Sequence, residues 1–139
     1  MAAINPYLTF KGNCEEAFNF YKAAFGGEFM GGQIMRFSSM GEYCAPGNEH
    51  LVMHVALPIA GGGILMGSDT AEGMGDFIVG TNVSVAIAGE SVEESDRLFA
   101  ALSEGGKITM PMADAPWGAY FGMFDDKFGI HWMINCDNK

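Results

Sequence analysis

Positive charge is scarce in this sequence. Seven Lys and Arg residues stand against 17 Asp and Glu residues, and the formal net charge of the 139-residue chain is −10 at pH 7. Nucleic-acid-binding proteins neutralise phosphates with Lys and Arg, and anionic membrane surfaces attract the same side chains. We therefore expect no nucleic-acid partner and no membrane partner.

Cysteines and long apolar runs are also scarce. Cys14, Cys44 and Cys136 are far apart and form no CxxC or zinc-finger spacing, which is typical of reduced thiols in the cytoplasm. The longest uncharged apolar stretch, 51–66, contains Pro58 and three consecutive glycines, so it is too broken to cross a bilayer. The first residues lack the basic and apolar segments of a signal peptide. These absences predict a cytoplasmic protein.

Hydrophobic residues, by contrast, make up 49% of the chain and aromatic residues 12%, a composition that excludes disorder. A chain of this length fits one domain and buries roughly two-thirds of its unfolded surface without disulfides or a structural metal. Twenty glycines predict many tight turns between strands.

The pattern of the chain indicates an internal duplication. A capping residue followed three residues later by Glu opens two helical patterns, one at Asn13 and one at Ser91. Each pattern carries an apolar stripe at three- and four-residue steps and ends at a pair of glycines, 26–27 and 105–106. The same start signal, similar length and same stop signal predict two copies of one unit.

One strand-like run precedes each helical pattern and three follow it. The runs are 7–10, 28–37, 50–57, 64–67, 83–87, 107–112, 120–124 and 130–135. The predicted order is therefore β-α-β-β-β, twice. Neither half could bury its sheet faces well alone, so we expect a single domain over 1–139. It would comprise module one at about 4–68, a linker at 69–80 and module two at about 81–136.

Alternation along the runs places polar side chains on the face turned away from the helices. A sheet that is helix-covered on one face and half-polar on the other is expected to curve around a ligand cavity. The candidate ligand-binding residues are those on this face, with Trp117 from a Pro-Trp-Gly loop: His54, Asn82, Ser84, Trp117, His131, Met133 and Asn135. The sequence identifies no catalytic residue.

The roles of three of these candidates stay open at this point. His54 and His131 would bind an anionic group or move a proton, or would only hydrogen-bond polar neighbours. Trp117 is either a lid that stacks on a ligand or a packing anchor. Met133 would make the wall of the cavity soft and adaptable.

Both ends of the chain carry distinctive motifs. The opening has PYLTF at 6–10, EEA at 15–17 and FY at 20–21, and the ending has MP at 110–111, PWG at 116–118 and DKFGIHW at 126–132. They resemble the PhnB-like branch of the vicinal oxygen chelate superfamily, which includes glyoxalases, fosfomycin-modifying enzymes, ring-cleaving dioxygenases and bleomycin-binding proteins. The resemblance covers essentially the whole chain. It implies an α+β fold in which paired β-α-β-β-β modules form an open, cupped mixed sheet with helices outside, usually within a homodimer.

The resemblance also implies where a metal site would lie. The superfamily's metal enzymes place His, Gln or Glu on the first, fifth and eighth strands, at positions that correspond here to Pro6, to Asn82 or Ser84, and to Met133. Pro and Met supply no hard ligand, and Asn or Ser alone is a weak one. Members of this branch often carry a methyltransferase label, but no glycine-rich cofactor loop supports one here. We therefore expect no metal and no cofactor.

Three functions remain as hypotheses. We favour a non-metal small-molecule binder, or an enzyme of unknown reaction, in a homodimer. The second is a metal-dependent glyoxalase-like lyase with relocated ligands, in which His131 would meet His50 or His54. Those two lie about 13 Å apart along a strand, so both cannot reach one ion. The third is a non-catalytic protein that sequesters a cationic drug or metabolite at its acidic surface.

Overall fold

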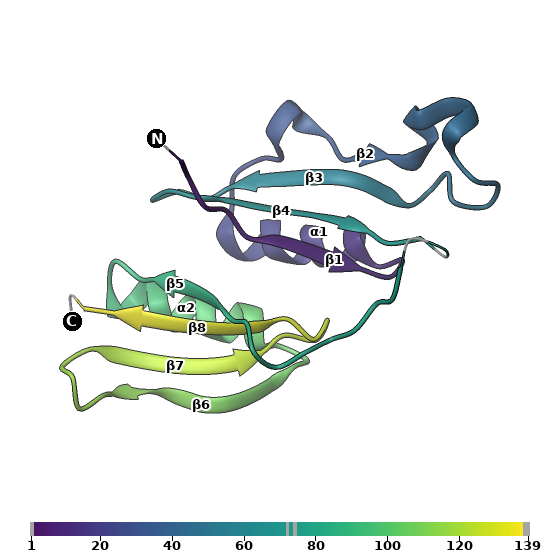
Figure 1. The fold of residues 1–139 in the computed structure, drawn as a ribbon. Coiled ribbons are helices and arrows are strands. Elements are labelled where there is room, and N and C mark those ends of the chain that lie inside the picture. Colours follow the sequence, from purple (N-terminus) through teal and green to yellow (C-terminus); the bar gives the residue numbers. More distant parts are fainter. Residues whose placement is uncertain (1, 72, 74, 138–139) are drawn as a thin grey trace. The chain divides into compact units, whose positions relative to one another are not determined.

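The computed structural model describes residues 2–71, 73 and 75–137. The chain divides into two compact units between Phe77 and Ile78, and each unit holds a four-stranded sheet and a 12-residue α-helix (Figure 1). The expected linker 69–80 spans this division, and its residues Glu72 and Met74 lie outside the described part. No helix within the described ranges has the length and apolar character needed to cross a membrane.

The first unit has the predicted order, with two 3-10 helices inserted. Its elements are β1 (Tyr7–Phe10), α1 (Cys14–Phe25), η1 (Met30–Gly32), β2 (Met35–Arg36), η2 (Phe37–Tyr43), β3 (Val52–Pro58) and β4 (Ile64–Asp69). The sheet order is β1-β4-β3-β2, in which β1 runs parallel to β4 and the other neighbours are antiparallel.

The second unit repeats this topology. Its elements are β5 (Val85–Ala88), α2 (Val92–Ser103), β6 (Lys107–Asp114), β7 (Tyr120–Asp125) and β8 (His131–Cys136). The sheet order is β5-β8-β7-β6, again with the first strand parallel to the last. The α+β fold of two β-α-β-β-β modules with open mixed sheets, predicted from the sequence, is confirmed.

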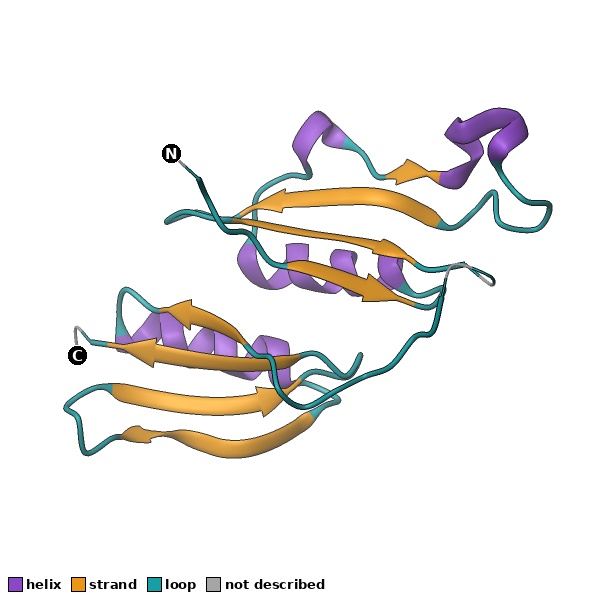
Figure 2. Cartoon of the chain, viewed as in Figure 1, coloured by secondary structure: helices purple, strands orange, loops and turns teal. Residues whose placement is uncertain are grey.

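Each helix covers one face of its own sheet (Figure 2). The stripe of α1 is buried as predicted, and it includes Cys14, Ala17, Phe18, Tyr21 and Ala24. Gly67 in β4 permits the close approach of α1, because a Cβ there would lie 2.6 Å from the ring of Phe18. In the second unit, Phe99 of α2 meets Phe124 of β7 edge-to-face, with ring centroids 5.0 Å apart. Within the described residues, neither α1 nor α2 covers the opposite face of its own sheet (Figure 2).

The predicted strand 28–37 is wrong except at its end. Only Met35–Arg36 forms a strand, which pairs with β3, and 3-10 helices lie on either side of it. Gly31 and Gly32 adopt positive φ values of 75° and 77°, a conformation that takes the chain out of an extended path. The turn at this glycine pair therefore interrupts the strand that the apolar residues of 28–37 favoured.

The fifth strand begins two residues later than predicted. It pairs with β8 from Val85 onward, so Asn82, Val83 and Ser84 lie before the strand, and the side chain of Val83 is exposed. The predicted alternation of faces therefore does not apply to Asn82 and Ser84. The carbonyl of Gly80, just upstream, is hydrogen-bonded to a side chain of β8 instead of continuing the strand pairing.

The two helices are capped in different ways. Ser91 caps α2 as predicted: its Oγ accepts from the Glu94 backbone N–H at 3.1 Å. Asn13 stands at the predicted N-cap position of α1, but the predicted capping is wrong, because its side chain makes no capping hydrogen bond. Asp69, at the end of β4, takes this role: its Oδ1 accepts from the backbone N–H groups of Gly12 and Cys14 at 2.9 and 3.0 Å. One carboxylate therefore joins the end of β4 to the start of α1.

Ser95 of α2 offers a test of the packing in the second unit. Its Oγ is buried without a hydrogen-bond partner in the described part of the chain, and a Cβ placed on Gly89 would overlap it. We expect Ser95→Ala to raise the free energy of unfolding by about 1 kcal/mol, because a buried unpaired hydroxyl is removed. Gly89→Ala should lower it by about 2 kcal/mol, through overpacking.

Urea denaturation of the two single variants and the double variant measures the coupling between these sites. Gly89→Ala should cost at least about 1 kcal/mol less in the Ser95→Ala background, since the clashing oxygen is gone. Strict additivity of the two substitutions would show that the overlap does not determine the cost.

Candidate functional site

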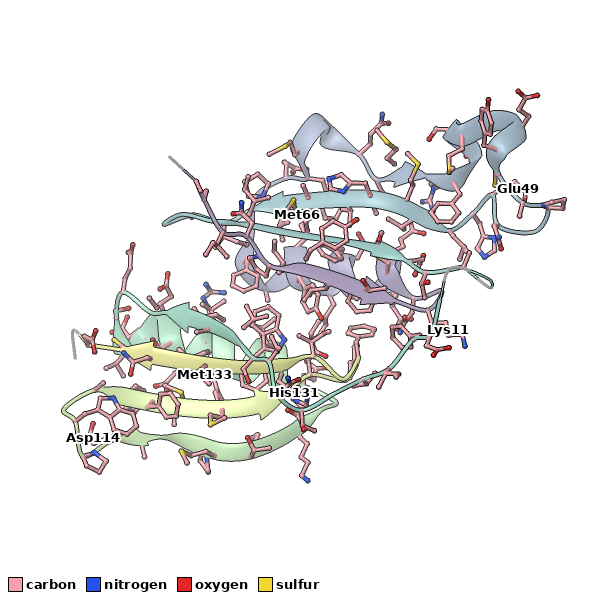
Figure 3. All side chains as sticks on the ribbon, in the orientation of Figure 1. Lys11, Glu49, Met66, Asp114, His131 and Met133 are labelled. Carbon is pink, nitrogen blue, oxygen red and sulfur yellow. The ribbon has the colours of Figure 1, made fainter. Side chains whose placement is uncertain are left out.

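The helix-free face of the second sheet is built from three cross-strand pairs of β7 and β8. Along β8, Trp132, Ile134 and Cys136 are buried on the helix side, so His131, Met133 and Asn135 alternate to the other side (Figure 3). The pairs are Asp125 with His131, Met123 with Met133, and Phe121 with Asn135. Neighbouring strands add Ala86 beside Met133 and Met110 beside Met123. We call these eight residues and Trp117 the open face of the second unit.

Trp117 extends this face from the loop before β7. Its indole Nε1 donates to Asn135 Oδ1 at 3.3 Å, and its ring meets Phe121 edge-to-face with centroids 5.3 Å apart. The side chain is nevertheless 64% exposed. Trp117 is therefore oriented by two neighbours while much of its ring surface stays accessible; its stacking on a ligand stays a prediction.

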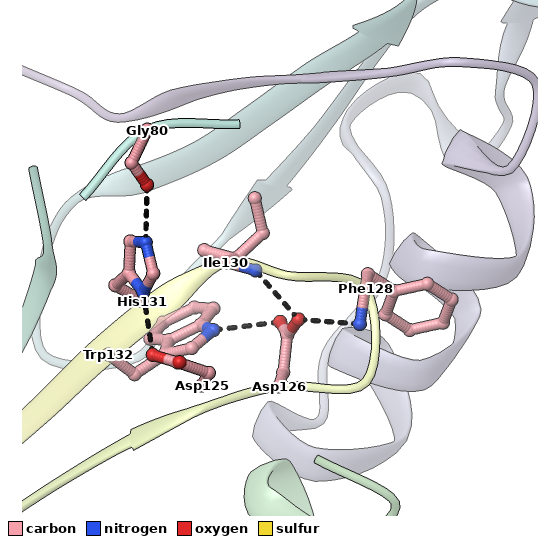
Figure 4. A network of polar contacts seen from close by, with 7 residues as sticks. All are labelled: Gly80, Asp125, Asp126, Phe128, Ile130, His131 and Trp132. Carbon is pink, nitrogen blue, oxygen red and sulfur yellow. Dashed lines mark hydrogen bonds and ion pairs between the residues drawn. The ribbon is translucent and has the colours of Figure 1, made fainter. Parts of the chain in front are cut away.

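His131 is held between two acceptors (Figure 4). Its Nδ1 lies 2.6 Å from Asp125 Oδ1, and its Nε2 lies 2.6 Å from the carbonyl oxygen of Gly80. An imidazole can donate to both only when both nitrogens carry protons. The hydrogen bond to Asp125 and, second, that to Gly80 raise the pKa of His131 above its ordinary value. Both ring nitrogens of His131 are therefore engaged, and neither is available to a metal or ligand without breaking one of these contacts.

Asp126, one residue after β7, is a buried carboxylate next to Asp125 in the chain. Its carboxylate is 3% exposed. Oδ1 accepts from the backbone N–H groups of Phe128 and Ile130 at 2.8 and 3.0 Å, and Oδ2 accepts from Trp132 Nε1 at 2.8 Å (Figure 4). It fixes the β7–β8 turn directly behind His131. An Asp between a strand and a glycine is common in turns, so the sequence pattern gave no sign of this burial.

In the first unit, His54 lies on β3 and stacks with Tyr7 of β1, with ring centroids 5.9 Å apart and planes 28° from parallel. Tyr7 pairs with Met66 across β1 and β4, and Met35 pairs with His54 across β2 and β3. His54 thus belongs to an aromatic and thioether surface of its own unit. His50, the other histidine considered, lies before β3 and not within it.

The structure therefore brings together part of the predicted set. Trp117, His131, Met133 and Asn135 share the open face of the second unit, whereas Asn82 and Ser84 lie exposed in the segment before β5. No three His, Cys, Asp or Glu side chains of the described residues gather in an arrangement that could hold a metal ion.

Comparisons with known proteins place the chain in a family. Residues 2–135 match the family described as 3-demethylubiquinone-9 3-methyltransferase. The crystal structure of protein PA1353 from Pseudomonas aeruginosa is 36% identical, with a TM-score of 0.87 over 99% of this chain and 98% of that chain. A Bacillus cereus PhnB protein, described as a putative 3-demethylubiquinone-9 3-methyltransferase, is 30% identical, with a TM-score of 0.75 over 97% and 99% of the two chains.

A more distant structure extends the likeness of fold. The glyoxylase/bleomycin resistance protein/dioxygenase domain from Frankia sp. EAN1pec has a TM-score of 0.69 over 98% of this chain and 91% of that chain. At 16% identity it supports the fold alone.

Proposed function

The chain belongs to the PhnB-like branch of the glyoxalase/bleomycin resistance/dioxygenase superfamily, and on this premise we propose that it binds a small organic molecule on the open face of its second unit, without a metal ion. One observation carries the proposal. Trp117 is 64% exposed although its N–H is hydrogen-bonded to Asn135 and its ring meets that of Phe121 edge-to-face. An oriented and exposed indole is suited to stacking on a flat ligand.

The chemistry of the open face favours an uncharged or cationic aromatic ligand. Met110, Met123 and Met133 supply polarisable thioethers, which adapt to ligand shape and make favourable contacts with aromatic rings. Asp125 of this face pairs with His131, and Lys107 of β6 lies opposite Asp125 in the sheet. With a net charge of −10 on the chain, an anionic ligand would meet net repulsion.

The residues at the superfamily's metal positions fit this proposal and not a metal enzyme. Met133 stands on β8 between Ala86 and Met123, where a hard metal would need an oxygen or nitrogen donor. Pro6 contributes its backbone carbonyl to a hydrogen bond from Met66. We therefore derive no step through a metal ion.

The residues also fit poorly to the methyl-donor cofactor that the family description implies. Anionic groups of cofactors commonly dock at helix N-termini. At α1 the carboxylate of Asp69 already accepts from the N–H groups of Gly12 and Cys14, and at α2 Ser91 accepts from Glu94. The proposal is therefore ligand binding, in a cytoplasmic homodimer, and it includes no methyl transfer.

Three aromatic probes of different charge test this function: 2-naphthol (neutral), proflavine (cationic) and 2-naphthoate (anionic). We expect the first two to bind, and the third to bind at least about tenfold more weakly. Trp117→Ala should weaken the binding of 2-naphthol and proflavine by about tenfold or more, because about 1.4 kcal/mol or more of stacking is lost. Isothermal titration calorimetry measures these affinities.

Tyr43→Ala is the matched control, because Tyr43 is a highly exposed aromatic residue of the first unit. It should leave all three affinities unchanged. Equal affinity in the Trp117→Ala variant, or preference for 2-naphthoate, would contradict the proposal.

A further inference from the structure

We propose that His131 is a proton-dependent clasp that holds the segment 78–84 against the β7–β8 hairpin, and that loss of one proton from its ring releases the segment. This inference does not depend on the ligand proposed above. It rests on the two contacts of the imidazole, one to Asp125 of β7 and one to the carbonyl of Gly80 (Figure 4).

The hydrogen-bonding capacity of histidine makes the clasp all-or-none. Asp125 Oδ1 and the Gly80 carbonyl are both acceptors, each 2.6 Å from a ring nitrogen. The imidazolium donates to both. A neutral imidazole has one N–H and one lone pair, so it faces one of these oxygens with a lone pair and must give up that contact.

The contact with Gly80 is the one expected to break. The pair of His131 and Asp125 lies on adjacent strands in fixed register, with their backbones directly opposite each other. Gly80, by contrast, belongs to a segment outside the regular strands, in which Ile78, Val79 and Val83 are exposed. Little other burial therefore retains the segment once the carbonyl is released.

The direction of the pH dependence follows from the groups around the ring. Asp125 from β7 and Asp126 from the following turn are the acidic groups that act on His131, and Lys107 of β6 lies opposite Asp125 in the sheet. The hydrogen bond to Asp125, the hydrogen bond to the uncharged Gly80 carbonyl and the charge of Asp126 raise the pKa of His131 above its ordinary value of 6.5. The clasp is therefore closed below this value and opens as the pH rises through the elevated pKa.

Nuclear magnetic resonance of the full chain, from about pH 5.5 to about pH 9, tests the clasp. The ring signals of His131 should titrate with a midpoint above the ordinary value, and the backbone amides of residues 79–84 should shift with the same midpoint. Amide exchange of these residues, corrected for the intrinsic effect of pH, should accelerate at the upper end.

Two variants and a control separate the clasp from a general effect of pH. Asp125→Asn should lower the shared midpoint by about one pH unit or more, because the opposite charge is gone. His131→Gln should abolish the transition in 79–84, whereas Asp114→Asn, a carboxylate of β6 in the same unit, should leave the midpoint in place. The proposal would be overturned if the amide signals of 79–84 did not shift with the titration of the His131 ring. It would also be overturned if the pH transition of 79–84 persisted in His131→Gln.

Discussion

Asp126→Ala is expected to lower the free energy of unfolding of the second unit by about 4 kcal/mol. The substitution leaves the backbone N–H groups of Phe128 and Ile130 and the indole N–H of Trp132 without their shared acceptor. Each buried donor left unsatisfied costs about 1–3 kcal/mol, and part of this is recovered where the opened turn admits water. Urea denaturation followed by tryptophan fluorescence measures the loss, because both tryptophans of the chain, Trp117 and Trp132, belong to this unit.

Asp125→Ala is the matched comparison for this prediction. Asp125 is the adjacent carboxylate, but it is partly exposed and its side chain pairs with His131 alone among the residues that the structure describes. Its loss should cost about 1 kcal/mol or less. The loss of unfolding free energy in Asp126→Asn should lie between those of Asp125→Ala and Asp126→Ala. The amide oxygen of Asn can accept from two donors, while its NH₂ group faces the indole N–H. Equal losses for Asp125→Ala and Asp126→Ala would show that the three buried bonds do not stabilise the unit.

Asp69→Ala is expected to have a comparable effect on the first unit and to lower its free energy of unfolding by about 3 kcal/mol or more. Asp69 is buried, and besides the N–H groups of Gly12 and Cys14 its carboxylate accepts from the N–H of Val52 at 2.9 Å. It therefore connects β4, α1 and β3, and its removal leaves three donors unpaired. Chemical denaturation followed by circular dichroism measures the change.

The thiol of Cys14 provides a local measurement of the same substitution. Burial, first, and the Asp69 carboxylate, second, hold the pKa of Cys14 far above its usual range. In a Cys44→Ser background, Asp69→Ala should make Cys14 react faster with a thiol reagent, because the charge is gone and the start of α1 is loosened. Asn13→Ala is the control: its side chain makes no capping hydrogen bond, so stability should change by no more than about 0.5 kcal/mol. A cost as large as that of Asp69→Ala would contradict the assignment of the cap.

These carboxylates also show which features of the fold can be predicted from sequence. The cap of α2 was predictable because Ser91 and Glu94 lie three residues apart and their contact is local. The cap of α1 was not, because Asp69 lies 55 residues from Cys14 and meets it only after β4 has joined the sheet. The length of the second strand was overestimated: 28–37 was predicted and only Met35–Arg36 forms. The apolar residues of 28–37 did not indicate how strongly Gly31 and Gly32 turn the chain.

In the candidate site, too, local features were predictable from the sequence and long-range contacts were not. Alternation along β8 predicted that His131, Met133 and Asn135 share a face, since period-two patterning depends on neighbouring residues alone. The partner of His131 on its other side, Gly80, lies 51 residues away and contributes only a backbone oxygen. A backbone acceptor has no signature in the side-chain pattern, so the clasp could be found only in the structure.

The different caps of the two helices have a consequence for the order of folding. Ser91 and Glu94 can close the first turn of α2 within a segment of a few residues, so this helix can nucleate before any strand has paired. The start of α1 acquires its acceptor only when a chain segment more than 50 residues away has docked, and that step carries the entropy cost of closing a long loop. The duplicated halves share a topology, yet we expect α2 to form early in folding and α1 to become stable only as its sheet is completed.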